Sequence, residues 1–253
     1  MSLRIGDAFG DGVRRAVTYS GGLLMALMFV YQLLFVGALN RIVTALLSPE
    51  AQARSELGLL LPVPVAVAAG LVVVGFLLGP VLYLWAARAL TRSQSDLDSL
   101  PSELLTRRIG RATVSAVGAN IVVSIAVLIG FILLIVPGIF LAISFVFVMF
   151  AIGVEDERVV DALRRSWTLA SGDRWPLLAL GLIVFIVAAV GSSFGSILSF
   201  VSPVAGQVGS LALRSVFIIV GYAILAEAYV QLADEKPPEA DAGRPARDPE
   251  PVA

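Results

Sequence analysis

The sequence predicts an all-α, polytopic membrane protein: a bundle of six transmembrane helices in three hairpins, each preceded by an amphipathic helix in the membrane interface. Three observations lead to this fold class. Of the 253 residues, 58% are apolar and only 15% are charged, which is too little charge to cover the surface of a soluble domain of this size. Between Arg111 and Glu155, 43 consecutive residues carry no charge, whereas about 20 helical residues cross a bilayer core. Further uncharged stretches cover residues 16–40, 57–87 and 175–213.

The uncharged stretches predict six spans within a single transmembrane domain, residues 1–233. We place the spans at 21–40, 62–87, 112–135, 138–154, 175–198 and 208–231. The longest stretch contains two spans, and Pro137-Gly138 is expected to form the tight turn between them. For residues 199–210 the sequence leaves two options open, an ordinary exterior loop and a segment that re-enters the membrane.

Short segments before spans one, three and five have helical periodicity, with one apolar and one charged face. The apolar faces consist of Ile5, Ala8, Phe9, Val13, Ala16 and Val17 in the first segment, Leu104, Leu105, Ile109 and Ala112 in the second, and Val159, Val160, Leu163, Trp167 and Ala170 in the third. Each segment is therefore expected to lie in the plane of the interface. Paired arginines recur in all three segments, which indicates a threefold internal repeat, with chance similarity of apolar sequence as the alternative.

The distribution of basic residues predicts the orientation in the membrane. Fifteen arginines and lysines fall on the side of the N-terminus and three, Arg41, Arg54 and Arg214, on the opposite side. Positive charge accumulates on the cytoplasmic side of membrane proteins. We therefore expect a multi-pass protein of the cytoplasmic membrane with both termini in the cytoplasm. Residues 234–253, rich in Pro, Ala, Asp and Glu, are expected to form a disordered acidic cytoplasmic tail.

The arginine pairs have two interpretations. The first, which we favour, is topological: positive charge holds each segment on the cytoplasmic side. The second is recognition of anionic lipid headgroups, for which each cation near the surface contributes about 1 kcal/mol. The candidates for such a lipid contact are Arg14, Arg15, Arg107, Arg108, Arg164, Arg165 and Trp167.

Few polar side chains lie inside the predicted spans. Gln32 falls midway along span one, Asn120 in span three, and Glu227 in the last turns of span six. Polar groups in membrane helices are candidates for function, although amides more often bond to a neighbouring helix. Arg214 is expected close enough to the outer end of span six for its side chain to reach the interface.

The sequence contains no catalytic signature. Cysteine and histidine are absent, which removes thiolate chemistry and the commonest general base and metal ligand. No Gly-rich phosphate loop is present, and the acidic clusters at Asp96/Asp98 and at residues 155–157 are typical of solvated loops. We therefore expect no enzyme activity, no cofactor, no metal site and no nucleic-acid partner.

One stretch resembles a known group of proteins. Pro137-Gly138-Ile139 opens a short span that ends at Glu155, and the residues from Asp161 to Leu169 precede Gly172-Asp173-Arg174-Trp175. This pattern resembles a signature of uncharacterised six-span prokaryotic integral membrane proteins, related to the membrane domain that accompanies glycerophosphodiester phosphodiesterases. The resemblance covers about 40 of 253 residues. It implies a helical multi-pass protein without enzyme activity, because the phosphodiesterase chemistry belongs to a separate soluble barrel.

Three function classes remain open. The favoured hypothesis is a non-enzymatic scaffold or accessory factor that contacts the bilayer, including anionic lipids, and binds a membrane protein partner or a second copy of itself. The alternatives are a transporter or channel for a small solute or lipid, with Gln32, Asn120 and Glu227 around one path, and a membrane-embedded enzyme of lipid metabolism. The enzyme would need several polar groups to converge near Glu227 and residues 155–161.

Overall fold

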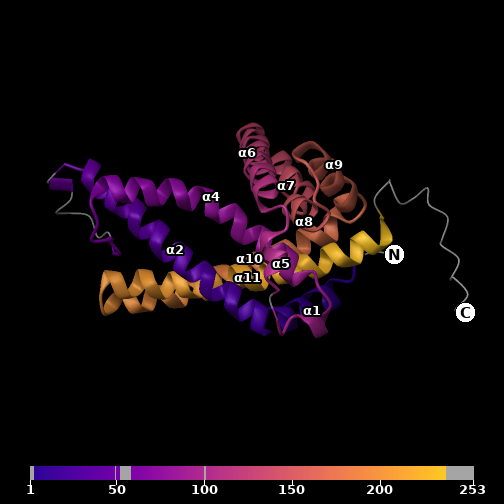
Figure 1. The fold of residues 1–253 in the computed structure, drawn as a ribbon, viewed down its shortest axis with the longest axis horizontal. Helices are drawn as coiled ribbons and strands as arrows, with labels where there is room; N and C mark the ends of the chain where they lie inside the picture. Colours follow the sequence, from indigo (N-terminus) through magenta and orange to yellow (C-terminus); the bar gives the residue numbers. More distant parts are fainter. Residues whose placement is uncertain (1–2, 49, 52–57, 100, 238–253) are drawn as a thin grey trace, which may run out of the picture.

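The structure, a computed structural model, describes residues 3–48, 50–51, 58–99 and 101–237, with the side chains of residues 102 and 190–196 left out. All regular elements of this part of the chain are helices (Figure 1). They are α1 (Ile5–Ala16), α2 (Tyr19–Leu46), α4 (Val65–Leu90), α5 (Ser102–Thr106), α6 (Ile109–Leu133), α7 (Ile135–Ser144), α8 (Val148–Val154), α9 (Val159–Ala170), α10 (Arg174–Ile197) and α11 (Pro203–Glu235), with short 3-10 turns at Gln94–Asp96 and Leu198–Phe200.

The predicted fold class is confirmed, and the number of spans is five or six. Four single helices, α2, α4, α6 and α11, and the combined segment Ile135–Val154 are each long and apolar enough to cross a membrane. A sixth candidate is the pair of α9 and the part of α10 up to Ala189, which counts as one span only if the two helices, bent by 97° at the break between them, are taken together. Three antiparallel pairs, α2 with α4, α6 with α7 and α10 with α11, form the most extensive helix contacts. The second pair continues into α8 after a break at residues 145–147.

The turn between α6 and α7 lies three residues before the predicted position. Leu134 alone separates the two helices, with an extended backbone (φ −166°, ψ 154°). Pro137 and Gly138 belong to the first turn of α7, where proline is tolerated because its missing N–H needs no partner. A Cβ added to Gly130 would lie 2.9 Å from the Cα of Gly138. The glycine at 138 therefore permits close helix packing and does not form the turn.

The prediction of a continuous second interfacial helix from Leu104 to Ala112 is wrong. α5 contains only five residues, and Arg108 turns the chain into α6 with a left-handed φ of 46°. The last carbonyl groups of α5 are bonded to α4: Arg88 Nη1 donates to Leu104 O and Trp85 Nε1 to Leu105 O. These tertiary bonds fix α5 against α4 and separate Leu104 and Leu105 from the face that continues into α6. Periodicity alone does not report such a break.

The amphipathic helix α1 is present, but most of its apolar face contacts protein and not lipid. Ala8 and Ala16 are fully buried, and Ile5, Phe9 and Val13 pack against the main core. α1 crosses α11 so closely that a Cβ on Gly12 would lie 2.5 Å from Ile224 Cα. On the apolar face of this segment, only Val17 is largely exposed, at 79%. An amphipathic pattern specifies an apolar face and does not specify what covers it.

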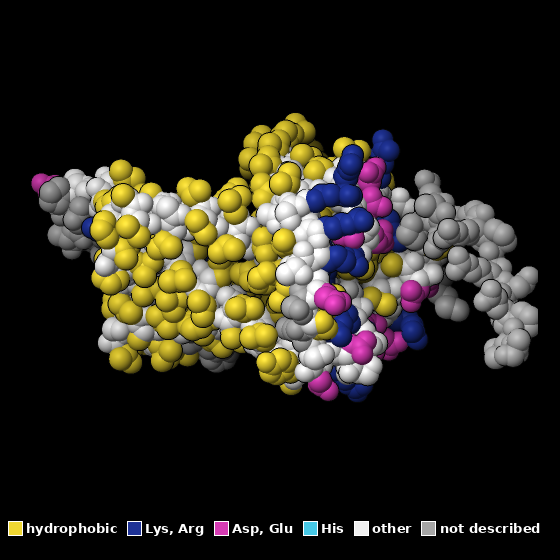
Figure 2. All heavy atoms as spheres, viewed as in Figure 1, with side chains coloured by type: hydrophobic (Ala, Val, Ile, Leu, Met, Phe, Trp, Pro, Cys, Tyr) yellow, Lys and Arg dark blue, Asp and Glu magenta, His cyan; other side chains and the backbone are white. Residues whose placement is uncertain are grey.

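Charge and apolar surface are separated along the long axis of the molecule. Arginines, lysines and acids gather at the end that holds the N-terminus and the last turns of α11, and apolar side chains cover the rest of the visible face (Figure 2). We call these the charged end and the apolar end. The main core, with Phe147, Phe150 and Tyr229, lies toward the charged end, whereas the helices expose long apolar stretches toward the other end, including residues 73–78 of α4.

The C-terminal helix extends slightly further than predicted. α11 continues through Glu235, and Lys236 is still held against α9. The predicted tail beyond residue 237 lies outside the described residues, as does Arg54. At the opposite end, a short turn and Pro203 lead directly into α11, with the Ser202 hydroxyl accepting from the Ala205 N–H. Residues 199–210 therefore form a turn and the start of α11.

Candidate functional site at the charged end

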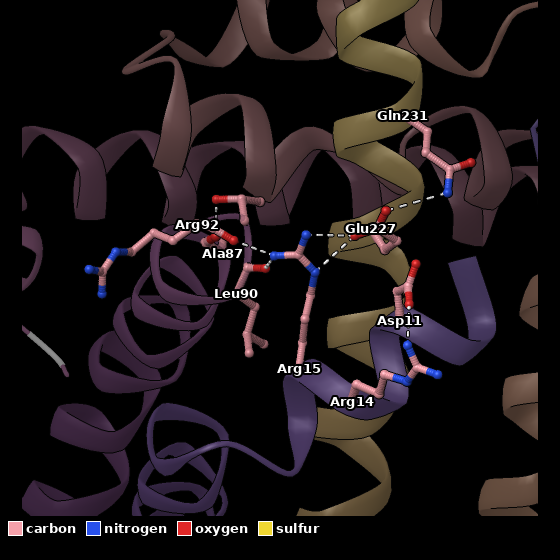
Figure 3. A network of polar contacts seen from close by, with 9 residues as sticks. Asp11, Arg14, Arg15, Ala87, Leu90, Arg92, Glu227 and Gln231 are labelled. Atoms are coloured by element: carbon pink, nitrogen blue, oxygen red, sulfur yellow. Dashed lines mark hydrogen bonds and ion pairs between the residues drawn. The ribbon is translucent and has the colours of Figure 1, made fainter. Parts of the chain in front are cut away.

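Arg15 connects the first helix to the last at the charged end. Its Nε and Nη2 lie 2.8 and 2.7 Å from Glu227 Oε2, and both side chains are 12% exposed. Nη1 donates to the carbonyl oxygens of Leu90 and Arg92 at the end of α4. Figure 3 shows Arg15 extending between α4 and α11, while Arg14 lies along α1 beside Asp11. The guanidinium thus joins three helices and leaves no free face for a lipid headgroup.

Arg165 has the same role in α9 that Arg15 has in α1. Its Nε donates to both carboxylate oxygens of Glu155, at 3.0 and 2.9 Å, and its side chain is 9% exposed. Tyr229 of α11 donates to Glu155 Oε1 at 2.6 Å. Arg165 Nη1 donates to Lys236 O at 2.5 Å. Several polar groups therefore converge here, as the lipid-enzyme hypothesis requires, but each of them is bonded to another.

A third cluster surrounds Asp156, which adopts a left-handed backbone at φ 58°. Arg107 Nη2 lies 2.9 Å from Asp156 Oδ2, and Arg111 donates to Asp156 O. Arg88, with a side chain only 3% exposed, lies 3.5 Å from Oδ1 and donates at 2.8 Å to Gly153 O. A buried cation is costly unless oxygen atoms compensate for the lost water, and Arg88 has such partners in Gly153 O and Asp156. The cluster fixes α4, α6 and the loop after α8.

Both ends of the described chain meet at Asp173. Its Oδ1 accepts from the Leu3 N–H at 3.1 Å and its Oδ2 lies 3.2 Å from Lys236 Nζ. Lys236 also donates to the carbonyl oxygens of Leu169 and Ser171. A cation is favourable at this position because the carbonyl groups at the end of α9 lack helical partners.

The structure divides the predicted headgroup residues into two groups. Arg15 and Arg165 point inward and pair with carboxylates, so neither guanidinium is free to bind a lipid headgroup in this structure. Arg107 is 51% exposed at its side chain but pairs with Asp156. Arg14, Arg108 and Arg164 are exposed. In α1 and α9, therefore, the second arginine of the pair is structural and the first faces outward.

Trp167 lies at the surface and is 39% exposed. Its ring meets Phe140 edge-on, with 5.6 Å between centroids. The guanidinium of Arg174 lies 4.8 Å from the Trp167 ring centroid and 4.6 Å from that of Phe140. This cation–π contact holds the bend between α9 and α10. Trp167 thus combines an exposed edge with a packing role.

Three arginines at the charged end have free side chains. Among the residues that the structure describes, Arg108, Arg158 and Arg164 form no side-chain hydrogen bond or ion pair. A groove of about 590 Å³ between α6 and α9 is lined by Arg111 and Arg158 together with Asp161, Val114 and Val160. Arg108 lies next to it, beside Arg111. Val114 is 74% and Val160 57% exposed, so the groove combines cationic and apolar surface.

Glu157 lies beside this groove, next to Arg108 and Arg111. Burial raises its pKa, and the neighbouring carboxylates of Asp161 and Glu155 raise it further. Arg165 and the Arg158 N–H act in the opposite direction. The ionised form of Glu157 is therefore disfavoured in the folded protein.

The predicted intramembrane residues do not surround a common path. Gln32 is buried between α2 and α11, where its Nε2 donates to Ser215 Oγ at 2.8 Å. Asn120 is exposed on α6 and accepts from Ser124 of the same helix. Glu227 is in the ion pair with Arg15. The transport path built on these three residues is therefore not formed.

The predicted site residues do not include Arg88, Arg158, Arg174 or Tyr229. Arg88 was counted only as topological charge, although its position at the end of an apolar span is a signal for a buried cation. Tyr229 lies within the sixth predicted span, and its partner Glu155 is 74 residues away in sequence. No local pattern reports that contact.

A family model, described as "Domain of unknown function (DUF7847)", matches residues 3–232. The chain belongs to this family. The DUF7847 match covers both the charged end and the helices that extend from it. No curated protein and no solved structure matches the chain. The DUF7847 assignment adds no activity or ligand, and the relation to the phosphodiesterase-associated domain stays a prediction.

Proposed function

We propose that this chain is a non-enzymatic, multi-pass protein of the cytoplasmic membrane, with both termini in the cytoplasm, that binds anionic lipid of the inner leaflet at its charged end. The observation that carries the proposal is the groove between α6 and α9. Arg111 and Arg158 line it, Arg108 lies beside it, and Val114 and Val160 are exposed next to them.

This arrangement suits the boundary between headgroups and hydrocarbon. Exposed valines are favourable in the acyl region, whereas guanidinium groups bind phosphate oxygens with two parallel hydrogen bonds. The N-terminus of α6 begins at the groove, and its helix dipole also favours an anion. Trp175, 81% exposed at the start of α10, belongs to a residue type enriched at membrane interfaces.

The orientation is part of the proposal and rests on the charge distribution. Of the described basic residues, only Arg41 and Arg214 lie away from the charged end, and Figure 2 shows the charged side chains concentrated there. A non-enzymatic role is supported by the pairing of the carboxylates: Glu155, Asp156 and Glu227 each contact an arginine. In this role the chain acts as a scaffold or accessory factor that binds a protein partner or a second copy of itself. Co-purification in native lipid would identify that partner.

The test compares lipid binding of the purified protein in nanodiscs of phosphatidylcholine with increasing phosphatidylglycerol. Arg108→Gln/Arg158→Gln removes the two free cations near the groove. Each cation contributes about 1 kcal/mol at an anionic surface, so we expect roughly fivefold weaker retention of phosphatidylglycerol per arginine. Arg4→Gln/Arg14→Gln is the matched control, because both arginines are exposed but paired with aspartates of α1. Equal retention by both double variants would refute the site.

The enzyme hypothesis needs a separate measurement. Glu227→Ala removes the α11 carboxylate that pairs with Arg15. If all lipid pools of cells carrying this variant stay unchanged, lipid chemistry at that carboxylate is excluded.

A further inference from the structure

A second groove lies toward the apolar end, between α7 and the α10–α11 pair. It has a volume of about 1150 Å³. Its walls are apolar and include Ile143 of α7, Leu178 and Phe185 of α10, and Phe217 of α11, together with Val146 in the break after α7. On α11 the lining residues recur every three or four positions from Gln207 to Leu225, so one face of this helix forms the floor.

Among the described residues, Arg214 is the single charged one that lines this groove. It is exposed, and within the described residues it forms no hydrogen bond or ion pair. Two other charged residues inside candidate spans, Arg88 of α4 and Glu227 of α11, are each in an ion pair. Arg214 is therefore a cation without a partner beside apolar side chains.

The position of Arg214 along α11 places it inside a bilayer. Thirteen residues separate it from Glu227, about 20 Å of helix. Eleven residues separate it from Pro203, about 17 Å. If a hydrocarbon core of about 30 Å begins near Glu227, Arg214 lies about 10 Å from the opposite boundary. An uncompensated arginine at this depth is costly, and such residues usually mark a ligand or an ion path.

We propose that this groove binds one anionic phospholipid of the leaflet opposite the charged end, with its phosphate at Arg214 and an acyl chain along the apolar wall toward Leu225. The long side chain of Arg214 extends the guanidinium toward that leaflet's headgroups. From Arg214 to Leu225 the floor is about 17 Å long, and its lining residues there are apolar apart from the Tyr222 hydroxyl. The direction of the chain therefore agrees with the ordinary orientation of a lipid in that leaflet.

Charge and apolar surface together select this occupant. A neutral lipid would leave Arg214 without a counter-charge, and a small soluble anion would not cover the apolar walls. The inference uses the membrane insertion of the proposed function, but it is independent of the groove between α6 and α9.

Native mass spectrometry from nanodiscs of phosphatidylcholine and phosphatidylglycerol tests the site. All proteins carry Arg108→Gln/Arg158→Gln, so that lipid retained between α6 and α9 does not contribute. The parent is expected to retain one phosphatidylglycerol molecule. Arg214→Gln should lower this retention at least fivefold, and Arg214→Lys should restore part of it.

A bulky substitution at one of two open glycines tests whether the groove must be empty for the lipid to bind. Gly181 lines the groove, and a Cβ at this position would meet no atom within 4 Å. Gly181→Phe should therefore fill the groove and displace the lipid without disturbing the helices. Gly70→Phe is the control, because Gly70 in α4 is equally open and lies outside the groove. The proposal is refuted if Arg214→Gln keeps the parent's phosphatidylglycerol. It is also refuted if a dimer mass, lost in Gly181→Phe, shows that a second copy occupies the groove.

Discussion

Nε and Nη2 of Arg15 both lie within 2.8 Å of one carboxylate oxygen of Glu227, although 212 positions separate the two residues in sequence. Arg15 also saturates two carbonyl groups at the end of α4. The first amphipathic helix is thereby fixed to the last long helix. Removing either partner would leave the other charge in a site that is nearly closed to water.

The ion pair leads to the first prediction. Glu227→Gln should lower the free energy of unfolding by about 3–5 kcal/mol, because Arg15 would remain buried without a counter-charge. Arg15→Met/Glu227→Leu should recover part of this loss, since no unpaired charge remains. Arg14→Met, which removes an exposed arginine paired with Asp11, should have almost no effect. Thermal unfolding in detergent measures the stability of each variant. A double variant that is no more stable than Glu227→Gln would contradict the prediction.

The second prediction concerns orientation. The chain contains no cysteine, so single cysteines report position without background. Ser48→Cys lies in the exposed segment after α2, and Ser95→Cys in the exposed turn after α4. With the charged end inside the cell, a membrane-impermeant maleimide should label Ser48→Cys in intact cells and Ser95→Cys only after lysis. The reverse labelling would place the charged end outside.

The α6–α7 pair gives the third prediction. Gly130→Val should reduce stability by about 1–3 kcal/mol, because its Cβ would lie 2.9 Å from the backbone of Gly138 and the helices must separate. Gly110→Val is the matched control near the start of the same helix, where an added Cβ has no neighbour within 4 Å. If both substitutions shift the unfolding temperature equally, close packing at Gly130 is not the cause.

Glu157 predicts a pH dependence. Its folded-state pKa is raised above the ordinary value of 4.5, mainly by burial and then by Asp161 and Glu155. Protonation therefore favours the folded state, and the destabilising effect of Glu157 develops as the pH rises through the folded-state pKa. Glu157→Gln should be more stable than the parent near neutral pH, with the difference shrinking in acid. The readout is the unfolding temperature of both proteins from pH 4 to pH 8, and a constant difference would refute the interpretation.

The sequence specifies the helices better than their contacts. Uncharged length predicted the spans because lipid exposure requires apolar residues over the full crossing. Arg14 and Arg15 are chemically identical, so only the position of α11 decides which one is buried. α5 is shorter than the predicted interfacial helix because Arg88 and Trp85 of α4 donate hydrogen bonds to its last carbonyl groups.

The start of the last helix also differs from the prediction, for a similar reason. The predicted sixth span began at residue 208, whereas α11 begins at Pro203. The earlier start places Arg214 further from the helix end and on the face that forms the groove. The missing information was the length of the preceding turn and the orientation of α7, both of which depend on tertiary packing.

The packing of α1 on α11 has a consequence for biosynthesis. Residues 5–16 are synthesised before the other described helices, yet their neighbours Ile224 and Glu227 belong to α11, the last of the described helices to be made. Until then, the apolar side of the N-terminal segment and its inward arginine lack their native cover. The native packing of α1 therefore forms only after α11 has been made, and a nascent chain stalled before residue 227 should present this segment to proteases or insertion factors.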